Sequence, residues 1–519
     1  MASPSRKTKA VREFGDFQTP PGLANDAAQL LAALGIAPQC ILEPTCGVGA
    51  FISAAAKAFP NARAVIGYDI NEEYLGSATA NVTDEGNRVV LRQGDFFKVD
   101  WQKVVTSHDS PWLIIGNPPW VTSAELGSIE SDNLPTKSNF HGRMGIEAIT
   151  GKSNFDISEW MLLRYLDWLE GDEGTIAVLC KTAVARKILG YIWKKKLPLK
   201  SARIFKIDAQ GHFGAAVDAC FFVLEIDPNN HAQTCDIFES LNAKRPTHTA
   251  GFHDGHWIND VPVFNRFRGL LGPEQHYVWR SGVKHDCSKV MELMATPEGM
   301  QNGLGEKIVL ENVITYPFLK SSDIGNGRIG SRGLMIVTQK LVGADTTSIK
   351  REAPKTWEYL QRHASLLDKR GSVIYKNKPA FSVFGVGPYT FSPWKIAISG
   401  FYKKLLFVKI GPVDGRPMVF DDTIYFLPCW SEGEADFLGE LLDTEPARAF
   451  FQSMINWDEK RPITVEILKR LNLRKVAELL GKESTYLRFA KRTEGPPTCG
   501  PLAGEEPQIP LGLGMQASQ

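Results

Sequence analysis

Several features that mark other classes of protein are missing from this chain of 519 residues. Its eight cysteines are scattered and none forms a Cys-x-x-Cys pair, which argues against a zinc module and against a disulfide framework. No apolar run approaches the roughly 20 residues of a membrane span, and the basic N-terminus lacks the apolar stretch of a secretory signal. We therefore expect a cytoplasmic protein with reduced thiols, no metal site and no membrane partner.

The composition is that of a packed globular protein, with 43% hydrophobic and 10% aromatic residues. The length allows two or three domains. Asp227-Pro228-Asn229-Asn230 reads as a linker, which predicts a first domain over 14–228 and a second over 231–490. We expect residues 1–13 and the Pro- and Gly-rich tail 493–519 to be disordered.

The tetrapeptide Asn117-Pro118-Pro119-Trp120 directly follows the apolar run 112–115. The Asn117 carboxamide oxygen and the Pro118 carbonyl can both accept hydrogen bonds from one amino group. The prolines fix the turn and supply no competing N–H, and Trp120 offers a flat surface on which a base can stack. The motif suits methylation of a planar amino group that is a poor nucleophile, although Asn-Pro-Pro also starts ordinary loops.

A glycine turn lies upstream, where Gly47 and Gly49 separate a short strand ending at 42 from an Ala-rich helix expected over 50–59. Glycines at such a turn let the backbone approach a ligand closely. A second expected strand, 65–70, carries Asp69, at about the 20-residue spacing where doubly wound folds place a ribose-binding carboxylate. The alternatives are a plain strand-to-helix connection and an Asp that caps the next helix.

A third expected strand, 88–92, leads to Asp95 and Phe96. Asp95 can accept a hydrogen bond from an adenine amino group, and Phe96 is either a ring that packs on that adenine or a core residue. The glycine turn, the acid, the Asp-Phe pair and the Asn-Pro-Pro-Trp motif each follow a predicted strand. Open α/β sheets bind ligands at that carboxyl edge.

With these motifs in this order, the chain resembles the gamma-class S-adenosylmethionine-dependent amino-methyltransferases of DNA. The stretch 43–51, Glu-Pro-Thr-Cys-Gly-Val-Gly-Ala-Phe, resembles their cofactor motif, and 117–120 their catalytic motif. The segment 15–20, Gly-Asp-Phe-Gln-Thr-Pro, is similar to the segment that folds over the methionine part of the cofactor. The resemblance implies S-adenosyl-L-methionine as cofactor, with contacts from Phe17, Thr19, Pro20, Glu43, Pro44, Cys46, Gly47, Gly49, Asp69, Ile70, Asp95, Phe96 and Asn117.

The resemblance also implies a fold and a reaction. The fold is α/β, a doubly wound Rossmann-like methyltransferase sheet, followed by a C-terminal mixed α+β target-recognition domain. The reaction is transfer of methyl to adenine N6 of a base flipped out of double-stranded DNA, with Asn117, Pro118, Pro119 and Trp120 as catalytic residues. N4-cytosine is the alternative base. Trp120 would stack on one face of the base and Phe213, in the loop 210–214, on the other, unless Phe213 is simply core.

Two positions depart from the family pattern. Trp120 stands where Tyr or Phe is commoner, which leaves the fit of the target base open. Gln18 stands where an aromatic residue is frequent. Neither change removes a chemical function from the site.

Basic residues are candidates for contact with DNA phosphates. The segment 181–206 is rich in Lys and Arg and contains no acid; the alternative is a solvated helix face. In the second domain, 316–324 and 384–394 resemble target-recognition segments, with basic residues near them. The candidate DNA contacts are Lys194, Lys195, Lys196, Arg328 and Arg332.

The remaining expectations concern local structure. The polar, Gly-rich stretch 126–152 follows the catalytic motif and is expected to be a loop that orders on DNA. In the second domain the patterns predict a strand over 382–387 and helical structure over 463–479. We expect a monomer, and the sequence leaves open whether a separately encoded restriction endonuclease is its partner.

Other functions fit parts of the chain. Methylases of RNA or of protein glutamine use the same catalytic motif, because their targets are also planar amines. A fused nuclease would need an acid-x-Lys triplet, and Asp458-Glu459-Lys460 is the one candidate. A catalytically dead module is the third alternative, against which the intact Asn117 and Gly47 argue.

Overall fold

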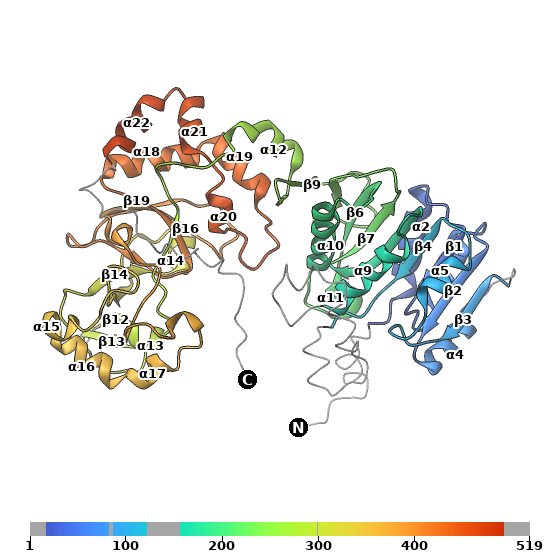
Figure 1. The fold of residues 1–519 in the computed structure, drawn as a ribbon, viewed down its shortest axis with the longest axis horizontal. Helices are drawn as coiled ribbons and strands as arrows, with labels where there is room; N and C mark the ends of the chain where they lie inside the picture. Colours follow the sequence, from blue (N-terminus) through green and yellow to red (C-terminus); the bar gives the residue numbers. More distant parts are fainter. Residues whose placement is uncertain (1–16, 83–86, 122–155, 298, 493–519) are drawn as a thin grey trace. The chain divides into compact units, whose positions relative to one another are not determined.

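We analysed a computed structural model of the chain, which describes residues 17–82, 87–121, 156–297 and 299–492 (Figure 1). The expected disordered ends and the expected loop 126–152 lie outside these residues. The chain divides into two compact units, residues 1–261 and 262–519.

The first unit is built on one sheet of ten strands in the order β10-β9-β8-β6-β7-β5-β4-β1-β2-β3. Strands β3, β2, β1, β4 and β5 run parallel, and β7 lies antiparallel between β5 and β6. This is the doubly wound, Rossmann-like sheet that the motifs predicted. The strands are β1 (Cys40–Glu43), β2 (Ala64–Asp69), β3 (Val89–Gln93), β4 (Trp112–Gly116), β5 (Gly174–Lys181), β6 (Ser201–Ile207), β7 (Ala219–Ile226), β8 (Thr234–Phe238), β9 (His248–His253) and β10 (His256–Ile258).

The linker at 227–230 does not end the first unit. After it the chain returns to the same sheet, where β8 pairs in parallel with β6 and β9 and β10 continue as antiparallel strands. The first unit therefore extends to Val261 rather than to the predicted 228. The Pro-Asn-Asn segment joins two strands of one sheet. The prediction of a turn is therefore correct, and the prediction of a boundary between domains is wrong.

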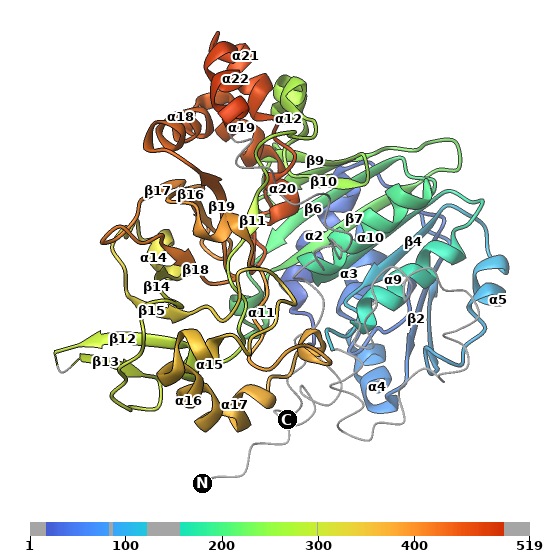
Figure 2. The same ribbon diagram turned by 60° about the vertical axis from the view of Figure 1, so that its left-hand side comes forward.

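Helices cover both faces of this sheet because its central strands are apolar on both sides. On β4, Trp112 and Ile114 face one cluster of buried side chains while Leu113 and Ile115 face the other. The first cluster includes α5, α9 and α10, and the second includes α2 and α3. These helices, visible in Figures 1 and 2, are α2 (Pro21–Ala33), α3 (Ala50–Ala58), α4 (Glu72–Asn81), α5 (Trp101–Thr106), α9 (Ile157–Trp168), α10 (Thr182–Lys195) and α11 (Ala209–Phe213).

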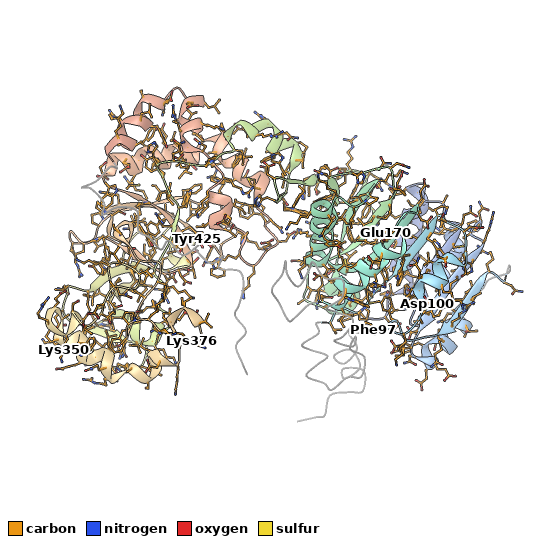
Figure 3. The ribbon with its side chains drawn as sticks, in the orientation of Figure 1. Phe97, Asp100, Glu170, Lys350, Lys376 and Tyr425 are labelled. Atoms are coloured by element: carbon orange, nitrogen blue, oxygen red, sulfur yellow. The ribbon has the colours of Figure 1, made fainter. Side chains whose placement is uncertain are left out.

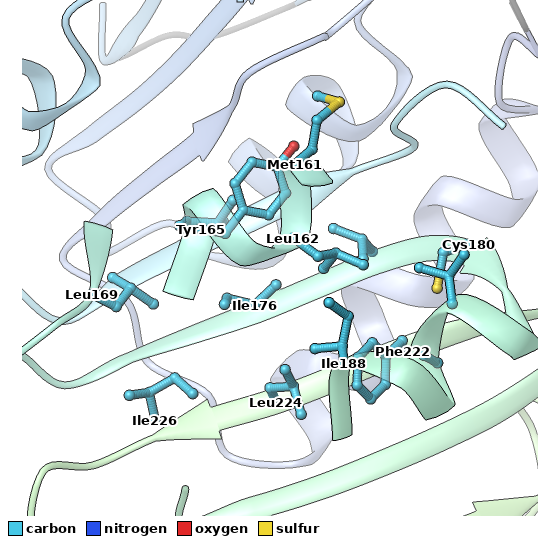
Figure 4. Packing of buried hydrophobic residues seen from close by; sticks show 14 of the residues in the cluster. Met161, Leu162, Tyr165, Leu169, Ile176, Cys180, Ile188, Phe222, Leu224 and Ile226 are labelled. Atoms are coloured by element: carbon cyan, nitrogen blue, oxygen red, sulfur yellow. The ribbon is translucent and has the colours of Figure 1, made fainter. Parts of the chain in front are cut away.

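Figure 4 shows part of the first cluster at close range. Met161, Leu162 and Tyr165 of α9 lie over Ile176 of β5, and Ile188 of α10 lies near Phe222 of β7. All of these side chains are nearly or fully buried. This packing joins α9 and α10 to β5 and β7 in one buried cluster.

The second unit contains two smaller sheets, which makes it the expected mixed α+β region. Their orders are β11-β19-β16-β17 and β13-β12-β15-β14-β18, and one buried cluster joins residues of β14 and β18 to residues of β16, β17 and β19. The strands are β11 (Arg280–Ser281), β12 (Glu292–Thr296), β13 (Gly299–Asn302), β14 (Thr315–Leu319), β15 (Gly333–Ile336), β16 (Trp394–Ser399), β17 (Val408–Ile410), β18 (Val419–Phe420) and β19 (Ile424–Cys429).

Its helices pack on these sheets, α18 against β16 and the α15–α17 group against the sheet that holds β14. They are α12 (Val261–Phe267), α13 (Ser288–Met291), α14 (Ser321–Gly325), α15 (Ile349–Glu352), α16 (Pro354–Arg362), α17 (Ala364–Asp368), α18 (Glu432–Asp443), α19 (Glu445–Met454), α20 (Val465–Leu468), α21 (Leu473–Leu479) and α22 (Glu483–Arg492), with short 3₁₀ turns at Arg268–Leu270, Val373–Tyr375 and Pro388–Phe391.

Two predictions for this unit were wrong in detail. The segment 382–387 forms no strand, because Phe381 and Gly385, with φ of 62° and 64°, interrupt the extended backbone, and only Phe384 makes an isolated bridge. The helix expected over 463–479 is split into α20 and α21. Asn472 breaks it by capping α21, accepting a hydrogen bond from the Lys475 N–H at 3.0 Å.

The described part of the chain contains seven cysteines, all as free thiols. None of the helices within it is long and apolar enough to cross a membrane.

Candidate active site

A cavity of about 480 Å³ lies at the carboxyl ends of β1, β2, β3 and β4. The structure brings most of the predicted site residues together around it. Pro20, Gly49, Pro118, Trp120 and Phe213 are not part of its wall. The predicted residues that line it are Phe17, Thr19, Glu43, Pro44, Cys46, Gly47, Asp69, Ile70, Asp95, Phe96, Asn117 and Pro119.

Asp69 braces the glycine turn. Its Oδ2 accepts a hydrogen bond from the Gly47 N–H at 2.8 Å, and its Oδ1 accepts one from the Asn71 N–H at 2.8 Å. Asn71, rather than Asp69, caps α4, with its side chain accepting from the Glu73 N–H at 2.9 Å. Asp69 also lines the cavity, where a carboxylate can accept hydrogen bonds from the hydroxyl groups of a ligand.

The two glycines of the turn serve different purposes. Gly47 lines the cavity at φ 50°, and a Cβ there would lie 2.6 Å from Gln18 Oε1. Gly49 has φ 80°, and its Cβ would lie 2.9 Å from the Ala78 Cβ on α4. Gly47 thus permits a close approach at the cavity wall, whereas Gly49 permits α3 and α4 to pack.

Glu43, at the end of β1, is only 2% exposed. Burial, and after it the charge of Asp69, raises the pKa of Glu43 well above its ordinary value. Its Oε2 is buried without a hydrogen-bond partner among the residues that the structure describes. A cationic ligand group beside Glu43 would supply the missing donor and favour the ionised carboxylate.

Cys46 is the other titratable group of the turn. Burial, together with the charges of Glu43 and Asp69, raises the pKa of its thiol. A raised pKa favours the neutral thiol over the nucleophilic thiolate.

Asn117 follows β4 and turns its carboxamide in a defined direction. Its Nδ2 donates to the Phe17 carbonyl at 2.8 Å, which identifies the other amide atom as the oxygen. Asn117 Oδ1 is buried and, within the described ranges, has no hydrogen-bond partner. The Asn-Pro-Pro-Trp motif thus presents a vacant acceptor at the cavity wall.

Trp120 and Phe213, predicted to flank one base, do lie together. Their ring centroids are 5.2 Å apart with planes at 71°. Phe17 contacts both rings, at 5.5 Å from Trp120 and 5.9 Å from Phe213. The three aromatic residues form a group, named here the aromatic triad, beside the cavity.

Asp95 and Phe96 follow β3 as predicted. Asp95 Oδ1 accepts from the Phe97 N–H at 3.0 Å, and its Oδ2 pairs with exposed Lys98 at 3.1 Å. Phe96 packs against Trp101, with centroids 5.2 Å apart, and also lines the cavity. Phe96 is therefore both a core residue and part of the cavity wall.

Sequence reasoning missed several wall residues. Gln18 accepts from the Val48 N–H at 3.2 Å, so its amide performs a polar role where the family often has an aromatic ring. Phe97, labelled in Figure 3, follows the Asp-Phe pair directly. Ile157 and Met161, one turn apart on α9, reach the cavity from beyond the catalytic motif, and no local pattern distinguishes them from core residues.

The predicted basic residues lie in two places. Lys194, Lys195 and Lys196 are at the far end of α10, a helix of 14 residues that starts at the cavity edge of the sheet, and thus about 21 Å along its axis. In the second unit, Arg328 and Arg332 pair with buried Asp323 at 3.2 and 3.5 Å. Asp323 orients both guanidinium groups, and Arg328 remains 60% exposed.

The acid-x-Lys triplet at 458–460 lies in the turn between α19 and α20. Glu459 Oε1 accepts from Asn456 Nδ2 at 3.2 Å, a local bond that shapes the turn. In the part of the chain that the structure describes, no three His, Cys, Asp or Glu side chains gather as a metal site.

No protein-family model matches the chain. It is 45% identical over 476 residues to the type II methyltransferase M.NspV of Nostoc sp., which covers 91% of this chain and 98% of that protein. The type II methyltransferase M.CvrRI of Paramecium bursaria Chlorella virus XZ-6E is 36% identical over 85 residues, 16% of this chain and 19% of the relative. Among solved structures, the chain is similar to the type IIL restriction-modification enzyme MmeI in complex with DNA, with 12% sequence identity and a TM-score of 0.44; the match covers 91% of this chain and 75% of that one. The nearly full-length match to the Nostoc protein shows the family, and the chain belongs to the type II methyltransferases.

Proposed function

We propose that this protein transfers a methyl group from S-adenosyl-L-methionine to adenine N6 of a base flipped out of double-stranded DNA. The observation that carries the proposal is the buried, unpartnered Oδ1 of Asn117, held at the cavity wall by the Nδ2 bond to Phe17. Buried polar atoms are normally hydrogen-bonded, so an unpaired acceptor beside a cavity calls for a donor from outside. An exocyclic amino group is such a donor.

The residues around the cavity suit S-adenosylmethionine. Its volume of about 480 Å³ is in the range of sites for small ligands. Asp69 would accept hydrogen bonds from the ribose hydroxyls and Asp95 from the adenine amine, and Ile70, half exposed, would provide an apolar surface for the adenine ring. Glu43 Oε2 would accept from the α-ammonium group.

The same wall supports the chemistry. The cofactor supplies an electrophilic methyl on its sulfonium. Asn117 Oδ1 and the Pro118 carbonyl accept the two amine hydrogens and so turn the nitrogen lone pair toward that methyl. A nitrogen–carbon bond forms as the sulfur–carbon bond breaks, and the amine then releases one proton to solvent. This contribution is positioning and electrostatic stabilisation, and it needs no covalent enzyme intermediate.

DNA is the proposed substrate because the chain carries a second unit, residues 262–519, in addition to the first unit that holds the site, and a small substrate would not need it. The oriented pair Arg328 and Arg332 is its best-supported candidate contact, and the Lys194–Lys196 cluster stays a weaker prediction. We propose a monomer that acts in restriction–modification, and a separately encoded restriction endonuclease as its counterpart. The alternatives are N4-cytosine in DNA, and amines of RNA or protein glutamine.

The decisive experiment is transfer of radiolabelled methyl from S-adenosylmethionine to unmethylated duplex DNA, followed by nucleoside chromatography. We expect the label in N6-methyladenine. Label in N4-methylcytosine would support the same transfer mechanism but show that the target base is cytosine. Label that resists DNase and appears in RNA or protein would overturn the assignment of substrate.

A further inference from the structure

Trp120 is anchored at both its ring and its backbone by the end of β5. Its indole Nε1 donates to the Leu179 carbonyl at 3.3 Å. Its own carbonyl accepts a hydrogen bond from Lys181 Nζ at 3.0 Å. The last residue of the catalytic motif therefore cannot shift without breaking one of two bonds to the central sheet.

Lys181 is held in turn by Asp156. Its Nζ lies 2.7 Å from Asp156 Oδ2, whose side chain is 8% exposed. Asp156 also caps α9, accepting from the Ser158 N–H at 3.1 Å, and the next residue, Ile157, donates its N–H to the Val121 carbonyl at 2.9 Å. The lysine thus joins the end of the catalytic motif, the start of α9 and the end of β5 at one point.

The place of this lysine in its own helix is unfavourable. Lys181 is the N-cap of α10 and makes no capping bond there. Helix N-termini favour Ser, Thr, Asp or Asn, and they repel cations because the helix dipole is positive at that end. Local helix stability therefore does not explain Lys181, whereas its two contacts across the site do.

Phe213, the other predicted wall of the base slot, has no such anchors. It ends α11, a helix of five residues, and its ring makes aromatic contacts only to Phe17, Trp120 and His212 among the described residues. Stacked bases are about 3.4 Å apart, so a base between two rings needs them roughly 7 Å apart and parallel. The observed 5.2 Å and 71° leave no room, so the slot must widen when a base enters.

We infer that Lys181 is a positioning residue that fixes Trp120 as the rigid wall of the target-base slot, so that Phe213 is the wall that moves. The inference rests on the proposed function. Asp156 holds the ammonium group in place, and Lys181 is not among the residues that line the cavity. A rigid wall next to Asn117 keeps the entering amine aligned with the Oδ1 acceptor, which serves the rate of transfer rather than cofactor binding.

The test compares Lys181→Met with Lys187→Met. Lys187, on α10, pairs with the nearly buried Glu159 of α9 at 2.5 Å, so its loss also removes an ion pair to α9 but no bond to Trp120. For each variant one measures kcat on unmethylated plasmid DNA, KM for S-adenosylmethionine, and the melting temperature. Lys181→Arg, which keeps a cationic donor, is the rescue variant.

We expect Lys181→Met to lower kcat on the order of ten- to a hundredfold, as misplacement of a reacting group does, with KM for S-adenosylmethionine within about twofold of wild type. Lys181→Arg should recover part of kcat, and Lys187→Met should keep it, even where the melting temperatures of all three fall. Equal kcat in both Met variants, or an effect of Lys181→Met only on the KM for S-adenosylmethionine, would overturn this inference and leave the proposed function standing. A wild-type enzyme that labels no DNA would overturn the proposed function, and this inference with it.

Discussion

Replacement of Asn117 by Ala removes both hydrogen-bonding atoms of its carboxamide, and we expect the two losses to affect different measured quantities. The change removes the vacant Oδ1 acceptor and also the Nδ2 donor that holds the Phe17 carbonyl at 2.8 Å. The amine becomes cationic as methyl transfers, and a hydrogen bond to a charged group contributes about 1.5–3 kcal/mol. Since 1.36 kcal/mol is tenfold in rate, kcat should fall roughly 10- to 150-fold from the acceptor alone.

The loss of the donor acts on the cofactor side, because Phe17 and Thr19 belong to the segment that lines the cavity. A neutral hydrogen bond contributes about 0.5–1.5 kcal/mol, so the Kd for S-adenosylmethionine should weaken by no more than roughly twelvefold. Calorimetric titration gives Kd and single-turnover methylation of plasmid DNA gives the rate. The signature of the mechanism is a loss of rate larger than the loss of cofactor affinity.

Asn472→Ala is a matched control. Asn472 likewise donates Nδ2 to a carbonyl, that of Pro273 at 2.8 Å, but it lies in the second unit as the cap of α21. We expect a lower melting temperature with unchanged kcat. An Asn117→Ala enzyme with wild-type kcat, or one whose defect is wholly in cofactor affinity, would refute the assigned role of Oδ1.

Three further predictions follow from individual contacts. The raised pKa of Glu43 means that the folded protein holds a proton which the unfolded chain releases, so stability falls as pH rises from the unfolded pKa toward the folded one. Glu43→Gln should therefore raise the melting temperature of the cofactor-free protein by an amount that grows as pH rises above the ordinary carboxyl pKa, and it should weaken cofactor binding; a pH-independent difference in melting temperature would contradict this. Gly49→Ala, with φ 80° and a Cβ 2.9 Å from Ala78, should lower the free energy of unfolding by about 1–3 kcal/mol, measured by urea denaturation; an undestabilised variant would show that α3 and α4 can separate freely. Arg328→Ala should weaken DNA binding and reduce the slope of log K against log salt by about 0.9 if it contacts one phosphate, and an unchanged slope would remove it from the interface.

The candidate site was largely predictable because each of its motifs is local. Glu43, Asp69 and Asn117 each follow an apolar run that becomes a buried strand, and parallel strands bring their carboxyl ends to one edge. The order of the strands could be inferred only from the family resemblance. That the motifs lie together at the carboxyl edge of the sheet could be inferred from the apolar runs that precede them.

The contacts that hold the site together were not predictable, because their partners are far apart in sequence. Asn117 bonds to Phe17 across 100 residues, and Lys181 bonds to Trp120 across 61. Neither pair has a spacing that a helix or strand would impose. Lys181 had been grouped with the basic residues of 181–206, since charge alone does not distinguish a phosphate contact from an internal one.

The predicted end of the first unit was wrong for a similar reason. The turn at 227–230 has the composition of a linker, and Asp227 does shape it by accepting the Asn229 N–H at 2.9 Å. A turn between two strands of one sheet and a turn between two domains use the same residues. Only the pairing of β8 with β6, a long-range fact, tells them apart.

Two unpartnered acceptors connect the energetics of the fold to its chemistry. Buried polar atoms that lack partners cost stability, and native proteins keep few of them. Glu43 Oε2 and Asn117 Oδ1 are two such atoms among the described residues, and both belong to side chains that line the cavity at the strand ends. Under the proposed function, ligands would supply the missing donors: an ammonium group for Glu43 and an amino group for Asn117. On this argument both ligands should stabilise the protein on binding, and the rise in melting temperature with cofactor should be smaller in Glu43→Gln than in the wild type.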